Sequence, residues 1–205
     1  MFWRCFLFWM TLQFGSVGAF AQSARDTGAR PPSIGAAVPV VPASRAAPPP
    51  AGVRDLKWEA LVPADWSPRQ AMDRLNLTTL SDNDPRANDL LAKLRAEWDR
   101  APVVKALAGQ KVRLPGYIVS LEGDAKGVRE FLLVPYFGAC IHLPPPPSNQ
   151  VVHVFPARPA SSGLALAPVW VSGVIETTSA DTEMGSASYR IRGATVEAYL
   201  KPNRK

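Results

Sequence analysis

Residues 131–155 of the chain have the sequence FLLVPYFGACIHLPPPPSNQVVHVF, in which two apolar runs flank a proline-rich centre. Two apolar runs, Phe131–Tyr136 and Val151–Phe155, have the β-branched and aromatic composition that is typical of strands. Four consecutive prolines, Pro144–Pro147, stiffen the connection between them because proline fixes its own φ angle. The stretch therefore predicts two strands that are joined by a rigid corner.

The same stretch contains the chain's scarce reactive side chains, which makes a metal site one hypothesis. Both histidines, His142 and His153, lie here together with Cys140. In an extended segment the side chains of Cys140 and His142 point to the same side, and a thiolate with imidazoles suits zinc or copper. His153 would be the third ligand if the loop folds back. The set is incomplete for a structural zinc site, which has four ligands.

Two other interpretations of the stretch remain open. Cys140 would be a nucleophile if a histidine acted as its base and Asn149 or Gln150 oriented that histidine, but no helix N-terminus is placed to lower the thiol pKa. Alternatively, the proline run docks on an aromatic groove, of this chain or of a partner. The loop and partner-binding residues are then Tyr136, Pro144, Pro145, Pro146, Pro147, Asn149 and Gln150. We prefer this architectural interpretation because it needs the fewest contacts, and we expect no enzymatic activity.

Outside this stretch, three more segments have the composition of strands. They are KVRLPGYIVSLE (111–122), Pro168–Thr178 and Ser188–Leu200. Five short strands with glycine bends predict a small, strongly curved sheet. We expect an α+β domain built on a five-stranded barrel similar to the oligonucleotide/oligosaccharide-binding (OB) fold, with a two-layer sandwich as the alternative.

One amphipathic helix is expected before the barrel. Asp84 is the candidate N-cap and Pro85 suits the first helical position. Apolar side chains then recur every three or four residues, at Ala87, Leu90, Leu91, Leu94 and Trp98. We therefore expect a helical N-terminal segment at residues 53–102 that packs on an OB-like β domain at residues 103–202.

The N-terminus predicts export. Residues 1–21 have a short apolar run followed by Ala19-Phe20-Ala21, the pattern of a cleaved signal peptide. Residues 22–52 are rich in proline and alanine and predict a disordered linker. A periplasmic protein with no membrane span in the mature chain is expected, and Cys140 would be its only cysteine. The net charge of +6 is scattered, which argues against nucleic-acid binding.

The run LPGYIVSLE…REFLLVPYFGACIHLPPPPSNQVVHV resembles the exported bacterial family catalogued as domain of unknown function 3299. The resemblance extends over Asp55–Leu200, although this chain has Ser120 where the family has a proline. It implies an envelope protein without enzymatic activity, accompanying an ABC-type transporter or a zinc or other metal uptake system. We therefore expect a non-enzymatic accessory protein. The alternative is a zinc- or copper-binding protein that uses Cys140, His142 and His153.

Overall fold

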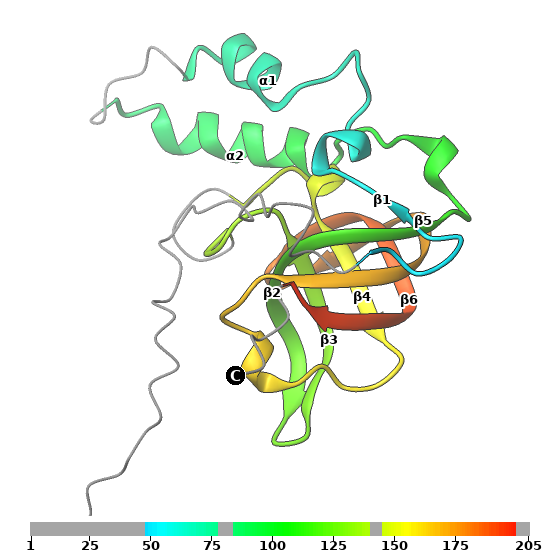
Figure 1. The fold of residues 1–205 in the computed structure, drawn as a ribbon. Coiled ribbons are helices and arrows are strands. Elements are labelled where there is room, and N and C mark those ends of the chain that lie inside the picture. Colours follow the sequence, from blue (N-terminus) through cyan, green and yellow to red (C-terminus); the bar gives the residue numbers. More distant parts are fainter. Residues whose placement is uncertain (1–47, 78–83, 140–144, 200–205) are drawn as a thin grey trace, which may run out of the picture. The chain divides into compact units, whose positions relative to one another are not determined.

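A computed structural model describes residues 48–77, 84–139 and 145–199 of the chain (Figure 1). Its elements in chain order are β1 (Arg54–Asp55), the 3₁₀ turn η1 (Trp58–Leu61), α1 (Pro68–Arg74), α2 (Ala87–Trp98), η3 (Lys105–Leu107), β2 (Lys111–Asp124), β3 (Gly127–Val134), η4 (Ser148–Gln150), β4 (Val152–Pro156), η5 (Ser162–Leu164), β5 (Val169–Thr182) and β6 (Gly185–Ala198). The described chain is thus mostly β-structure with two α-helices.

The strands form one sheet in the order β1-β2-β3-β4-β6-β5, and β2 also pairs with β5. The β1–β2 and β4–β6 pairs are parallel, and the other pairs are antiparallel. All five predicted strands are present. The sheet has a sixth strand, β1, which the sequence pattern did not indicate because it has only two residues.

Strand β2 contains a Pro115-Gly116 pair. The strand continues through both residues but changes partner there, from β5 at Gly116 to β3 at Tyr117. A Cβ atom on Gly116 would lie 2.7 Å from the Leu133 side chain and 2.8 Å from the Val134 carbonyl oxygen. Glycine is therefore required by the close approach of β3.

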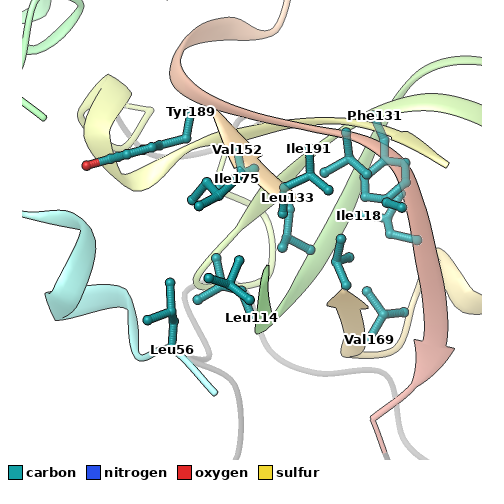
Figure 2. Close-up of a cluster of buried hydrophobic side chains, with 14 of the residues drawn as sticks. Leu56, Leu114, Ile118, Phe131, Leu133, Val152, Val169, Ile175, Tyr189 and Ile191 are labelled. Atoms are coloured by element: carbon teal, nitrogen blue, oxygen red, sulfur yellow. The ribbon is translucent and has the colours of Figure 1, made fainter. Parts of the chain in front are cut away.

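The hydrophobic core lies on one face of this sheet (Figure 2). Alternate residues of each strand, such as Val112 and Leu114 on β2, are fully buried in it, as the twofold period of a strand requires. Leu56 and Leu61, from the segment before the helices, are buried in the same cluster. Tyr189 lies at its edge, and Figure 2 shows its hydroxyl directed away from the aliphatic side chains. The N-terminal segment and the sheet thus share one core.

The two α-helices lie together at one end of the strands (Figure 1). Helix α2 confirms the predicted amphipathic helix, but Leu94 is its only fully buried side chain and Leu91 is 45% exposed. The predicted N-cap was wrong: Arg86 occupies that position, and the Asp84 carboxylate accepts hydrogen bonds from the Arg86 amide and guanidinium. Within the described residues, no helix has the length and apolar character needed to cross a membrane.

Candidate interaction site at the proline corner

Residues 145–150, which we call the proline corner, lie between the sheet and helix α2 and form hydrogen bonds with both. Pro146 and Pro147 are buried, and the turn η4 that follows them buries Ser148 and Asn149. The Ser148 hydroxyl donates to the carbonyl oxygen of Trp98, the last residue of α2, at 3.0 Å. The Asn149 amide Nδ2 donates to the carbonyl oxygen of Pro102 at 2.9 Å. The corner therefore holds the C-terminal end of α2 and the chain just beyond it.

The corner is also fixed to the sheet. The hydroxyl of Ser188 on β6 donates to the Ser148 hydroxyl at 2.7 Å, so a chain of two hydrogen bonds runs from β6 to α2. Asn149, one of the loop and partner-binding residues expected from the sequence, is fully buried, and its Nδ2 bond to Pro102 lies within the chain. Gln150 is half-buried, and its side chain makes no hydrogen bond with the described residues.

The segment that leads into the proline run packs on a second hydrophobic cluster. Its buried members are Tyr117, Leu132, Val134, Ala139, Val151 and Ala187. Tyr136 and Phe137 pack against it half-buried, and the Phe137 ring lies 5.6 Å from that of Tyr117, edge to face. Burial raises the pKa of the Tyr117 hydroxyl. Cys140, His142 and Pro144 lie outside the described residues, so the structure does not place two of the three predicted metal ligands.

The third predicted ligand, His153, is buried on β4 and held by a carboxylate. Its Nε2 atom lies 2.7 Å from Oε1 of Glu130 on β3, and its ring lies 4.5 Å from that of Phe155. Because the carboxylate accepts, Nε2 carries the proton in the neutral ring and Nδ1 carries the lone pair. Nδ1 is buried and has no partner among the described residues. Those residues contain no group of three His, Cys, Asp or Glu side chains that could hold a metal ion.

A groove of about 340 Å³ runs between helix α2 and the proline corner. It is lined by Leu91, Ala92, Leu94, Arg95, Trp98, Asp99, Pro145 and Pro146. Leu91 is one of the few large apolar side chains that the described chain exposes. The Trp98 indole N–H is buried and finds no acceptor among the described residues. The groove is therefore apolar in its walls, with one charge of each sign at Arg95 and Asp99.

Sequence reasoning missed several of these residues. Glu130 could not be assigned to His153 because that contact depends on the register between β3 and β4, in which Leu132 lies opposite His153. Ser148 was also missed. The available sequence signal for it was its position between the last proline and Asn149. The groove itself has no local sequence signal, since its two walls are separated by some fifty residues of chain, as the Ser148–Trp98 bond shows.

The described chain is thus a small β-rich domain with two α-helices and an apolar groove between α2 and the proline corner. The model of the family described as "Protein of unknown function (DUF3299)" matches residues 58–198. The chain therefore belongs to the DUF3299 family, as the resemblance of its proline corner predicted.

A solved relative agrees with this assignment. The crystal structure of a DUF3299 family protein from Pseudomonas aeruginosa PAO1, at 2.45 Å resolution, is 41% identical to this chain. The match covers 74% of this chain and 99% of that one, with a TM-score of 0.56. The comparison with curated proteins found no match.

Proposed function

We propose that this protein is an exported, periplasmic, non-enzymatic accessory protein of the cell envelope. In this proposal it binds a component of an ABC-type transporter or metal uptake system through the groove between α2 and the proline corner. The observation that carries the proposal is the exposed Leu91 beside Trp98 and Pro145 in one groove. Contiguous exposed apolar surface marks binding sites more often than chance.

The rigidity of the groove supports the same proposal. One wall is helix α2, whose end is held by Ser148, and the other is the run of prolines, which has little conformational freedom to lose. Binding to a preorganised surface costs less ordering entropy. The partner that fits is an extended segment with a bulky apolar side chain for the space beside Leu91, and with a charged residue that pairs with Arg95 or Asp99.

The finer fold assignment, an OB-like barrel, is part of this proposal. The pairing circuit β2-β3-β4-β6-β5-β2 supports it, because each of these five strands then has two neighbours and OB folds are partly open five-stranded barrels. Such barrels serve many functions, so the fold gives no argument for the partner.

Substitution within α2 tests the proposed function. Leu91→Asp places a charge in the groove, whereas Lys93→Asp places the same charge on an exposed residue of the helix that does not line it. We expect the tagged chain, purified from the envelope of its own host, to retain a transporter component in the wild type and in Lys93→Asp. Leu91→Asp should lose it. If the two variants retained the transporter component equally, the groove would not be its binding site.

The second candidate function is zinc or copper binding by Cys140, His142 and His153. The specific observation in its favour is the geometry of His153, because metal-binding histidines commonly donate their other ring N–H to a carboxylate. Here Glu130 has that place, and Nδ1 is left with its lone pair and no partner among the described residues. The donor set of one thiolate and two imidazoles fits either metal and leaves a fourth position open.

Metal titration distinguishes this candidate from the first. The reduced, metal-free chain is titrated with zinc and with copper(I), beside the variants His153→Gln and Cys140→Ser. A metal site requires one equivalent to bind in the wild type and at least tenfold weaker binding in both variants, on the scale at which even outer partners of metal ligands matter. Unchanged binding in either variant would contradict it, whatever the result of the Leu91 experiment.

A further inference from the structure

A cleft of about 350 Å³ lies over strands β2, β5 and β6. Val174 of β5 lines it between two cations, because Val174 is paired with Lys111 of β2 on one side and with Arg192 of β6 on the other. Residues directly opposite each other project from the same face of a sheet. The next residue, Ile175, is buried in the core, so these three side chains lie on the outer face. Neighbouring strands are about 4.8 Å apart, which puts the Cα atoms of Lys111 and Arg192 about 10 Å apart, so that both side chains can reach one bound ion.

The same cleft contains a buried hydroxyl, that of Ser172. Ser172 of β5 lies opposite Thr195 of β6, and both residues line the cleft. Ser172 is only 8% exposed, and its Oγ atom has no hydrogen-bond partner among the described residues. A buried hydroxyl without a partner is a cost to the folded state. An acceptor that enters the cleft removes this cost, so Ser172 itself points to a ligand.

A bulge in the β5–β6 pair shapes the cleft. The register of the pair shifts between Ser172 and Val174, and β6 contributes Gly193 at this point, with φ = +61°. Bulges re-aim the side chains beside them and are frequent next to active sites. Gly193 lines the cleft, and a Cβ atom on it would meet no atom within 4 Å. The space beside Arg192 is therefore open.

The two cations are available to a ligand. Lys111 and Arg192 are exposed, and neither forms an ion pair with another described residue. The Arg192 guanidinium lies 4.9 Å from the centre of the Phe155 ring. This contact positions the guanidinium over the ring without occupying its N–H donors. The cleft thus offers two positive charges beside two hydroxyls.

We propose that this cleft binds a phosphate group, either as inorganic phosphate or as part of a small phosphomonoester. Lys111 and Arg192 pair with the charge, and the hydroxyls of Ser172 and Thr195 donate to oxygen atoms of the phosphate. Charge-assisted hydrogen bonds of this kind are about twice as strong as neutral ones. Four donors suit a tetrahedral group, which presents acceptor oxygens in several directions. Val174, which is 41% exposed, provides an apolar contact for the organic part of an ester.

Glu197 also lines the cleft and limits its affinity for an anion. It is exposed and lies opposite Trp170, two residues along each strand from the Ser172–Thr195 pair. Its carboxylate repels a bound phosphate, so removal of this charge should strengthen binding. The phosphate cleft shares no lining residue with the groove beside α2, so it does not depend on the proposed function.

Titration calorimetry with inorganic phosphate and with phenyl phosphate, at constant ionic strength, tests the site. The purified wild type should bind one equivalent of phosphate group. Lys111→Gln and Arg192→Gln should each weaken binding about fivefold, a modest change because solvent screens exposed charges. Glu197→Gln should strengthen it about threefold. Arg158→Gln is the control, because it removes the same charge as Arg192→Gln from an exposed position outside the cleft, and it should leave the affinity unchanged.

Ser172→Ala separates binding from stability. The variant loses a hydroxyl that has no partner among the described residues, so the urea midpoint should not fall, whereas phosphate should bind about tenfold more weakly. Tighter binding of phenyl phosphate than of inorganic phosphate would assign the site to an ester, and equal binding would assign it to the free ion.

Three results would overturn the phosphate site. They are the absence of saturable binding in the wild type, equal weakening by Arg192→Gln and Arg158→Gln, and unchanged binding in Ser172→Ala. A lower urea midpoint in Ser172→Ala would show that the hydroxyl already has a partner within the chain, and it would overturn the site as well.

Discussion

The hydrogen-bonded serines of the proline corner give the sharpest prediction, which is a double-mutant cycle. Ser148→Ala removes the hydroxyl that donates to Trp98 and accepts from Ser188, so a backbone carbonyl and a buried hydroxyl lose their partner. With about 1 kcal/mol for each hydrogen bond lost, the free energy of unfolding should fall by about 2 kcal/mol. Ser188→Ala breaks only one of the two bonds and should cost about 1 kcal/mol.

The double variant should cost no more than Ser148→Ala alone, because the Ser188 hydroxyl has already lost its partner. The expected coupling is therefore about 1 kcal/mol, within the range seen for residues in contact. Urea unfolding measures it: at a slope of about 2 kcal/mol per molar, Ser148→Ala moves the midpoint by about 1 M. Gln150→Ala is the control and should move the midpoint little. Additive effects of the two serine variants, within about 0.3 kcal/mol, would refute the hydrogen-bond chain.

Three further predictions concern the rest of the fold. Tyr189→Phe should cost about 2 kcal/mol in urea unfolding, because the buried hydroxyl donates to the Leu61 carbonyl and accepts from the Val104 amide, both at 2.7 Å. Burial raises the pKa of the Tyr189 hydroxyl in the folded protein, and the hydrogen bond from Val104 opposes this in part. The neutral hydroxyl therefore contributes its full stability below about pH 10, which is the pKa of tyrosine in the unfolded chain. This stability is lost as the pH rises through the pKa of the folded protein. The unfolding free energy of the wild type should fall more steeply above pH 10 than that of Tyr189→Phe, and parallel curves would contradict this. Asp55→Asn leaves the buried Arg113 without its carboxylate and should therefore lower the thermal midpoint. The expected loss of stability is only about 2 kcal/mol, because Asp55 is half exposed. An unchanged midpoint would show that the ion pair contributes nothing to stability. Gly116→Ala forces a Cβ against the Val134 carbonyl oxygen and should cost about 2–3 kcal/mol by calorimetry, whereas Gly109→Ala, with no atom near its Cβ, should show only the strain of its positive φ.

Local patterns were enough to predict the strands. Alternation in Val112 and Leu114, or in Phe131 and Leu133, reports burial of one face, and the structure buries these side chains completely. The amphipathic spacing of α2 was equally informative about the existence of the helix. It was not informative about its surroundings, because the same stripe includes Leu94, which is buried, and Leu91, which is exposed.

Features that depend on pairing between distant segments could not be predicted. The β4–β6 pair is parallel and joins residues separated by the whole of β5, and no local pattern encodes that choice. Glu130 meets His153 only because of the β3–β4 register. The N-cap error at Asp84 is a local failure. Its carboxylate accepts from the Arg86 amide and guanidinium, but the N-cap lies two residues further on, at Arg86, and the helix begins at Ala87.

The proline corner was recognised from the sequence, but its action was only partly predicted. Four prolines indicated that the connection is stiff. The structure adds that Ser148 holds the end of α2, which makes one wall of the groove. The proline corner therefore helps to shape the groove beside α2, although the two segments are far apart in the sequence.

Photo-crosslinking in intact cells tests whether the protein binds an envelope partner in this groove, as we propose. A photoreactive amino acid replaces Leu91 in the groove or, as the control, Asn88, which is exposed on the same helix and does not line it. We expect an adduct from position 91, identified by mass spectrometry as a transporter or metal-uptake component, and no such adduct from position 88. No adduct at position 91, or the same adduct from both positions, would contradict it.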